Sequence, residues 1–457
     1  MTFHLAGSAT NGRSGTLAVV ATCLAITTLD GLDLIMFGTV LPTLLEKEEW
    51  GITAASAGLV GSLSLVGMLI GAMFAGYFTD IVGRRPVILA CVVNFSLFTA
   101  LCAFAPNLEL FGLFRFAAGI GFGGALPTVI ALTMEYVPFE RRQFFNGVIQ
   151  TGFTIGGCVA AISAIYVIPA YGWHMMFLVG GALGVVVLAI TLKTLPESVA
   201  FLIQKGRHDE AQAIMVRYSI DMRTESGRAV TEDGSDTGRG RALARLFAPG
   251  YRGATVLFPL ISFCGLLVAY AMNTWIPQML RSTGYDLGSA LVFLLAFNLG
   301  SAMGMVVLSG LADRFGPRPV ISTGFVVGAI AVSVLTLEPA QALVFALILL
   351  IGFCSASQTA VSGFVGIYYP PRARGTALGL AIGLGRLGGV CGPIVAGLIV
   401  GSSLGTQWAF YVFAAVGLVA AALVVAVPKR QPDTVAVPAA RPAAAHRADM
   451  SATQSDS

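Results

Sequence analysis

The chain has 457 residues, of which only 50 are charged, or 11%. An ordinary soluble domain carries roughly 25% charged residues, so this chain has too few to cover a surface that faces water. Hydrophobic residues make up 56% of the chain, and its 55 glycines are typical of membrane helices that pack closely. The composition therefore predicts a polytopic membrane protein and excludes a soluble enzyme.

The apolar residues fall into twelve blocks, each long enough to cross a bilayer as a helix, which takes about 17 residues or more. The predicted spans are 17–45, 53–78, 87–105, 109–137, 144–168, 173–195, 252–281, 287–312, 319–337, 340–369, 375–402 and 406–427. The first span is not a signal peptide, because its apolar run is too long and contains Asp30 and Asp33. The predicted fold is all-α, with twelve transmembrane helices in two bundles of six.

Polar stretches divide the chain into five parts. The predicted parts are a cytoplasmic segment 1–16, a bundle 17–195, a cytoplasmic linker 196–251, a second bundle 252–427 and a disordered cytoplasmic tail 428–457. The start of the linker mixes apolar and charged residues at helical spacing, which predicts a helix on the membrane surface. With both termini in the cytoplasm, 23 of the 27 basic residues lie on the inner side, as the positive-inside rule requires.

Two short motifs occur once in each half of the chain. Residues 80–86 (DIVGRRP) are echoed by 313–319 (DRFGPRP), and 138–142 (PFERR) by 370–374 (PPRAR), at offsets of 233 and 232. Two matches at nearly one offset indicate a duplicated unit. Transporters built from such repeats bind their substrate near the midplane, where the halves meet, and rock one half against the other.

Four ionisable residues lie clearly inside the predicted spans: Asp30, Asp33, Arg115 and Arg386. Each is costly in a membrane unless it is paired or hydrated, so a functional role is the default. Asp30 and Asp33 share one helix face, where repulsion between like charges favours binding of a proton. We expect proton coupling by these two residues with Arg115; the alternative is that one aspartate only neutralises Arg115.

Arg386 lies among glycines, close to the midplane of the membrane in the eleventh span. The predicted spans of the second half of the chain contain no acidic residue. An unpaired guanidinium is a natural anchor for a carboxylate, which it holds through two parallel hydrogen bonds. The alternative is an ion pair with Asp30 or Asp33 across the halves. Uncharged candidates for the substrate cavity are Tyr270, Asn273, Trp275, Gln278, Asn298 and Gln358.

The first copy of the loop motif predicts a gate on the inner side. Asp80 can sit at a helix N-terminus and pair with basic residues of the neighbouring loop, which would hold the gate shut; the alternative is a solvated turn. The remaining gate candidates are Gly83, Arg84, Arg85, Glu135, Arg142 and Asp313. For Glu135 the alternative to a role in the gate is a salt bridge at the membrane interface.

Residues 76–85 (GYFTDIVGRR) resemble the signature loop of the major facilitator superfamily, and 115–124 (RFAAGIGFGG) resemble its fourth-span motif. Residues 30–33 (DGLD), 195–198 (LPES) and 385–393 (GRLGGVCGP) look like the aromatic acid:proton symporter family. The resemblance implies the major facilitator fold in a monomer. It also implies import of benzoate or a hydroxybenzoate across a bacterial inner membrane for aromatic catabolism, driven by the proton gradient without a cofactor. The implied functional residues are Asp30, Asp33, Asp80, Arg115, Glu135 and Arg386.

Other classes of function are compatible to different degrees. A proton antiporter that exports small drugs or metabolites shares the loop motif, and a passive channel or a sensor is a third class. An ATP-driven pump is excluded, because none of the four lysines follows a glycine and no Walker A loop can form. The seven cysteines show no metal-binding spacing, and we expect no metal and no nucleic acid partner.

Overall fold

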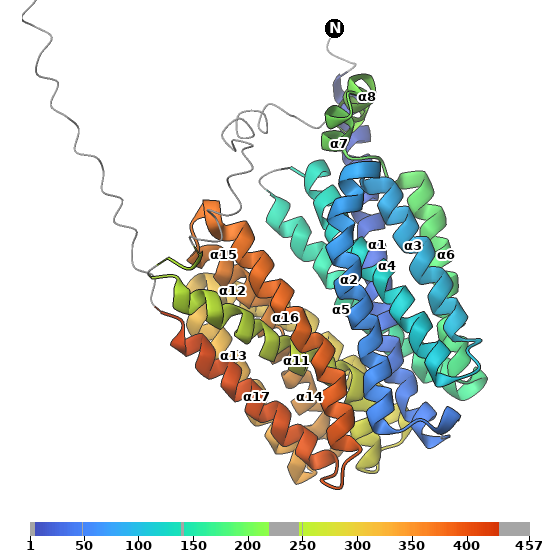
Figure 1. The fold of residues 1–457 in the computed structure, drawn as a ribbon, viewed down its shortest axis with the longest axis vertical. Coiled ribbons are helices and arrows are strands. Elements are labelled where there is room, and N and C mark those ends of the chain that lie inside the picture. The colour runs from blue at the N-terminus through green and yellow to red at the C-terminus, as the bar shows by residue number, and fades with distance from the viewer. Residues whose placement is uncertain (1–4, 48, 139–140, 219–245, 249, 429–457) are drawn as a thin grey trace, which may run out of the picture.

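The computed structural model describes residues 5–47, 49–138, 141–218, 246–248 and 250–428. Residues 219–245 of the predicted linker and almost all of the predicted tail therefore lie outside the described residues. Within them, twelve helices are long and apolar enough to cross a membrane. They form two bundles side by side (Figure 1), as the composition and the repeat predict.

Each bundle contains six membrane spans. The first bundle comprises α1 Leu5–Glu46, α2 Ala54–Val82, α3 Arg84–Cys102, α4 Leu108–Tyr136, α5 Arg142–Tyr171 and α6 Trp173–Thr194. The second comprises α11 Arg252–Ser282, α12 Leu287–Phe315, α13 Pro317–Val334, α14 Gln341–Ser355, α15 Ser357–Tyr368, α16 Pro371–Val400 and α17 Thr406–Ala426. Helices α14 and α15 form one span that is interrupted at Ala356. Two short 3₁₀ helices, Glu49–Gly51 and Leu335–Leu337, lie in connections.

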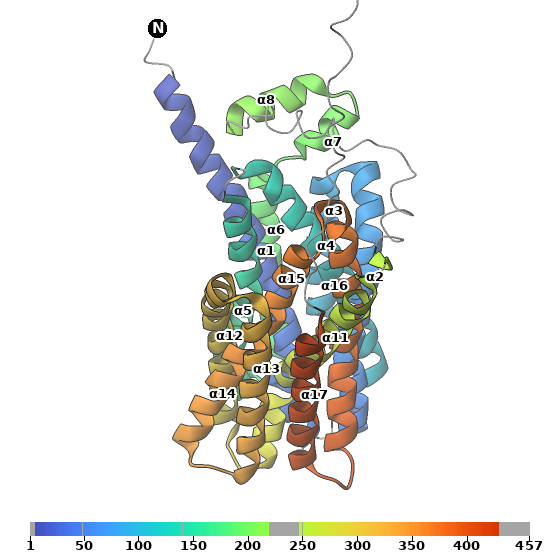
Figure 2. The same cartoon turned by 90° about the vertical axis from the view of Figure 1, so that its left-hand side faces the viewer.

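Two helices outside the bundles mark one end of the molecule. Helices α7 Val199–Gln204 and α8 His208–Tyr218 lie beyond the ends of the spans (Figure 2), and we name this side the linker end and the opposite side the far end. In α8, Ala211 is buried and the ring of Tyr218 lies 5.0 Å from that of Tyr136. The predicted surface helix is thus two helices fixed to the first bundle.

The two bundles contact each other closely at the far end. The hydroxyl of Ser62 in α2 donates to the carbonyl oxygen of Val390 in α16 at 2.7 Å, and Arg281 forms an ion pair with Glu46 at 2.7 Å. The backbone of α2 also approaches α16, because a Cβ added to Gly58 would lie 2.5 Å from the carbonyl oxygen of Pro393. The far end is therefore closed.

The contact between α2 and α16 does not continue to the linker end. Among the described residues, nothing lies within 4 Å of the position that a Cβ would take at Gly76 of α2, or at Gly375, Gly379 and Gly383 of α16. These glycines face open space, whereas Gly58 is packed against the other bundle. The structure is closed at the far end and open between α2 and α16 at the linker end.

Candidate functional site

A cavity of about 200 Å³ lies between the two bundles. Both halves contribute to it: α1, α4 and α5 from the first, and α11, α12 and the interrupted span α14–α15 from the second. Eleven of its seventeen lining residues carry a polar side chain, and one of these, Asp30, is ionisable at the carboxyl group. The lining residues are Thr27, Asp30, Leu126, Gln150, Phe153, Thr154, Leu266, Ala269, Tyr270, Asn273, Asn298, Ser301, Met305, Ser355, Ala356, Gln358 and Thr359.

Five residues that the sequence suggested for this site line the cavity: Asp30, Tyr270, Asn273, Asn298 and Gln358. Three other candidates lie elsewhere. The indole of Trp275 is fully buried and donates to the carbonyl oxygen of Pro393 at 3.1 Å, so it packs α11 against α16. Gln278 and Arg386 are not among the lining residues.

Other lining residues were not foreseen. Helix α5 contributes Gln150, Phe153 and Thr154, and α1 contributes Thr27. A single threonine, glutamine or phenylalanine in an apolar span does not stand out as a charge does. These residues could be predicted only from the rotation of each helix about its axis, which decides the face that points toward the cavity. The sequence does not determine that rotation.

Asp33 and Arg115 form an ion pair inside the first bundle. Arg115 Nη1 lies 2.6 Å from Asp33 Oδ2, and the two side chains are 1% and 2% exposed. The hydroxyl of Thr99 donates to the other carboxylate oxygen at 2.7 Å, and the guanidinium lies 5.5 Å from the centre of the Phe37 ring. Asp33 is therefore satisfied by partners within its own half and does not line the cavity.

Asp30 has no such partner. It is 4% exposed, lines the cavity, and its Oδ1 has no hydrogen-bond partner. Arg386 is close enough for its charge to act on Asp30 and on the Tyr270 hydroxyl, although it is not among the lining residues. Arg386 Nη1 is itself buried without a hydrogen-bond partner. An acid of one half and a base of the other therefore lie near the cavity with unsatisfied polar atoms, a costly arrangement that a ligand or a proton can relieve.

Two aromatic rings meet across the cavity. Phe153 of α5 and Tyr270 of α11 come from opposite halves, and their ring centres lie 6.3 Å apart at an interplanar angle of 75°. Both residues line the cavity. This edge-to-face arrangement is one that aromatic rings prefer, and a third ring can join it in the same way.

The amide side chains of the cavity differ in their partners. Asn298 Nδ2 donates to Asn273 Oδ1 at 3.3 Å and to the carbonyl oxygen of Leu294 at 3.0 Å. Asn273 Nδ2 donates to the carbonyl oxygen of Ala269 at 3.0 Å. The two asparagines thus fix each other and their own helices. The Gln358 side chain makes no hydrogen bond with the described part of the chain, and its Oε1 is buried.

A polar network lies at the linker end of the first bundle. Arg84 pairs with Glu135 at 2.5 Å, and Glu135 also accepts hydrogen bonds from the hydroxyl of Ser198 and the N–H of Val199. Glu197 Oε1 accepts from the N–H groups of Arg84 and Arg85. The connections after α2, α4 and α6 are therefore tied together. The sequence did not predict a role for Glu197 in this network, because the motif that contains it, 195–198 (LPES), indicated a family resemblance and no contact.

The other gate candidates occupy the same end of the molecule. Gly83 has φ +100°, a conformation that favours glycine, and joins α2 to α3. Asp80 and Asp313 lie near the ends of α2 and α12, are exposed, and make no ion pair with another described residue. Arg142 begins α5. The latch proposed for Asp80 is thus not formed in this open arrangement of the linker end.

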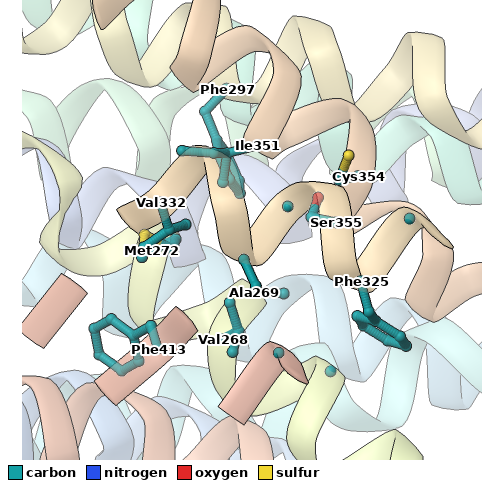
Figure 3. Close-up of a pocket in the computed structure, with 15 residues that line it drawn as sticks. Val268, Ala269, Met272, Phe297, Phe325, Val332, Ile351, Cys354, Ser355 and Phe413 are labelled. Atoms are coloured by element: carbon teal, nitrogen blue, oxygen red, sulfur yellow. The ribbon is translucent and has the colours of Figure 1, made fainter. Parts of the chain in front are cut away.

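A second and smaller cavity, of about 40 Å³, lies within the second bundle (Figure 3). Its labelled side chains are apolar except for Ser355, and they include Met272, Phe297 and Phe413. Ala269 and Ser355 line both cavities. The smaller one has room for about three water molecules, too little for an aromatic acid, whereas the larger one has room for about a dozen or more.

Two six-helix bundles around a shared cavity, closed at one end and open at the other, define a secondary transporter rather than an enzyme. A sequence model of the Major Facilitator Superfamily matches residues 23–310 and 260–453. The chain is 37% identical over 398 residues to the gentisate transporter of Corynebacterium glutamicum, covering 86% of this chain and 83% of that one. It is 33% identical to the benzoate transport protein of Acinetobacter baylyi, covering 84% of each chain.

The chain is also 30% identical to the 4-hydroxybenzoate transporter PcaK of Pseudomonas aeruginosa, covering 86% of this chain and 87% of that one. Among solved structures, the partially occluded inward open conformation of the xylose transporter XylE from E. coli matches with a TM-score of 0.72 at 17% identity, covering 91% of this chain and 100% of that one. The chain therefore belongs to the major facilitator superfamily and, within it, to the aromatic acid:proton symporter family.

Proposed function

We propose that this protein imports an aromatic carboxylate together with protons across a bacterial inner membrane, as a monomer driven by the proton gradient. The single observation that carries the proposal is a pair of unsatisfied groups from opposite halves, Asp30 in the cavity lining and Arg386, whose charge acts on it. Gentisate, benzoate and 4-hydroxybenzoate are the substrates named for the relatives, and each joins an aromatic ring to a carboxylate.

The two parts of such a substrate match two features of the cavity. The ring can pack against Phe153 and Tyr270, which line the cavity from opposite halves and meet edge to face. The carboxylate can approach Arg386, whose charge acts on Tyr270 and whose Nη1 has no hydrogen-bond partner. A fork of two parallel hydrogen bonds makes arginine a specific receptor for a carboxylate.

The position of Asp30 suggests how the proton is coupled to the substrate. A charged Asp30 competes with the substrate carboxylate for Arg386, since both are anions attracted by one guanidinium. Protonation of Asp30 removes this competitor and makes the binding of the carboxylate more favourable. By linkage, a bound carboxylate raises the affinity of Asp30 for a proton by the same factor. Proton and substrate then bind together, as symport requires.

The distribution of the basic residues supports an orientation in the membrane, and that orientation assigns the state of the transporter. We place the linker end, with both termini, in the cytoplasm, because the basic loop residues gather there. A structure that is closed at the far end and open between α2 and α16 at the linker end then faces inward. Return to the outward-facing state closes the linker end, where we assign Asp80 and the network of Arg84 and Glu135 to the gate.

The experiment is uptake of radiolabelled benzoate and hydroxybenzoates into proteoliposomes with an imposed pH gradient, acidic on the side of the far end. Symport gives accumulation that disappears when a protonophore collapses the gradient.

Arg386→Ala should abolish carboxylate binding, whereas Arg374→Ala, at an exposed arginine of the same helix, should leave it unchanged. Undiminished affinity in Arg386→Ala removes it as the anchor. Export of lipophilic cations in place of acid uptake overturns the proposed function.

A further inference from the structure

The cavity contains more polar side chains than one carboxylate can use. Eleven of the seventeen lining residues are polar, and they come from both halves. A bare benzoate has a carboxylate at one edge and only C–H groups on the rest of the ring. Several of these groups already bond to the protein, such as Thr27, Thr154 and Asn298. A lining group without such a partner would face the apolar ring, which costs free energy whenever water is displaced without replacement of its hydrogen bonds.

Apart from Asp30, Gln358 is the lining residue that has a buried polar side-chain atom without a hydrogen-bond partner among the described residues. Its carboxamide has two donors and two acceptor positions, and it makes no hydrogen bond with the described part of the chain. Asn273 and Asn298, by contrast, are held by each other and by helix carbonyls. Gln358 also follows the interruption of the span at Ala356, so it projects from the first turn of α15 beside the cavity.

The carboxamide of Gln358 lies against a glycine of a facing helix, Gly265 of α11. A Cβ added to Gly265 of α11 would overlap Gln358 Oε1, so the side chain lies directly against that backbone. Burial of Oε1 there leaves the Nε2 end of the group as its accessible part. A hydroxyl group on an aromatic ring is a donor and an acceptor at once, and it can satisfy the carboxamide in either orientation.

We propose, building on the proposed function, that Gln358 recognises a ring hydroxyl and that the preferred substrates are ring-hydroxylated benzoates rather than benzoate itself. A site built to hydrogen-bond a substrate hydroxyl discriminates strongly against the analogue that lacks it, because the polar group of the protein is then left unpaired. Gln358 is a specificity-determining residue in this scheme, whereas Asp30 and Arg386 act on every aromatic acid alike.

The test compares kcat/KM for uptake of benzoate, its three monohydroxy isomers, 2,5-dihydroxybenzoate and 3,4,5-trihydroxybenzoate in proteoliposomes with a pH gradient. The wild type should prefer at least one hydroxylated acid over benzoate by about tenfold or more. Gln358→Leu should reduce that preference to about twofold through lower uptake of the hydroxylated acids, and an apparent melting temperature in detergent close to that of the wild type shows that the variant is folded. Gln341→Leu, at an exposed glutamine of the same span, is the matched control.

Gly265→Ala provides a second and independent variant. Its added methyl group displaces the Gln358 carboxamide without removing it, and the preference for hydroxylated acids should fall as it does in Gln358→Leu. An equal loss for benzoate and hydroxylated acids in both variants overturns the assignment of Gln358. A wild type that takes up benzoate as well as every hydroxylated acid overturns the inference while the proposed function stands. Absence of uptake of all these acids contradicts the proposed function itself.

Discussion

Arg115 Nη1 lies 2.6 Å from Asp33 Oδ2 in a buried ion pair. Because of this pair, the two aspartates of α1 have different roles. Asp33 is neutralised by Arg115 and accepts a hydrogen bond from Thr99, whereas Asp30, one turn away, lines the cavity with an unsatisfied oxygen. The sequence places both acids on one helix face and near one depth. The structure distinguishes them by what faces each one, and the distinction can be measured.

Removal of one partner of the buried pair should destabilise the protein. Asp33→Asn leaves the Arg115 guanidinium buried without a counter-charge, and breaking such a pair costs about 3 kcal/mol or more. The apparent melting temperature in detergent, followed by intrinsic fluorescence, should fall clearly. The double variant Asp33→Asn with Arg115→Gln should recover much of the loss, because no unpaired charge remains. A single variant as stable as the wild type would show that the pair is dispensable for the fold.

Asp30→Asn should have a different effect. The amide is neutral at every pH and cannot carry a proton, so uptake should lose its dependence on the pH gradient while binding of the acid is retained. Because the variant also removes the anion that competes for Arg386, binding of the substrate at neutral pH should be as tight as in the wild type at low pH. Binding is measured by scintillation proximity between pH 5 and 8. A variant that still accumulates acid in response to a pH gradient excludes Asp30 as the proton carrier.

Asp80 lies exposed at the end of α2 and makes no ion pair with another described residue in this open arrangement of the linker end. If Asp80 pairs with basic loop residues only when the linker end closes, this pairing stabilises the outward-facing state and the transition state that leads to it. Asp80→Asn should therefore slow turnover several-fold and leave the binding affinity for the acid nearly unchanged. Asp209→Asn, at an exposed aspartate of α8, serves as the control. Unchanged turnover in reconstituted vesicles would mean that Asp80 belongs to a solvated turn.

The membrane spans could be predicted from the sequence because burial in lipid requires long apolar blocks, and the helices follow those blocks within a few residues at most ends. The exceptions have physical reasons. Helix α1 begins at Leu5, well before the predicted residue 17, because helical hydrogen bonds do not stop where apolar residues do. The span 340–369 is interrupted at Ala356, and no proline or charge in the sequence marks that position.

The candidate site could be predicted only where a residue is costly in a membrane. Asp30, Asp33, Arg115 and Arg386 stand out for that reason, and so their residue numbers could be given. Which aspartate pairs with Arg115 depends on helix rotations of a few tens of degrees that no local pattern encodes. The same holds for Trp275 and Gln150: the first is conspicuous and packs away from the cavity, and the second is inconspicuous and lines it.

The contact between α2 and α16 has a register that predicts how the linker end closes. Gly58 approaches Pro393, and Ser62 bonds to Val390, so the two helices are antiparallel and their paired residue numbers have a nearly constant sum. Extended along both helices, the same register places Gly76 opposite Gly375. Both glycines face open space here. We expect them to come together when the transporter faces outward, since small residues allow membrane helices to approach closely.

Cysteine cross-linking tests this register directly. The pair Gly76→Cys with Gly375→Cys should cross-link only in the outward-facing state. The far-end pair Ala54→Cys with Gly401→Cys should cross-link in the state seen here, which is closed at the far end, because a Cβ at Gly401 lies 3.3 Å from that of Ala54. Conditions that favour one bridge should disfavour the other, and either bridge should stop transport until it is reduced. The single-cysteine variants are the controls for the native cysteines. If the two bridges formed together in one molecule, the halves would not rock about the cavity, and alternating access through α2 and α16 would be wrong.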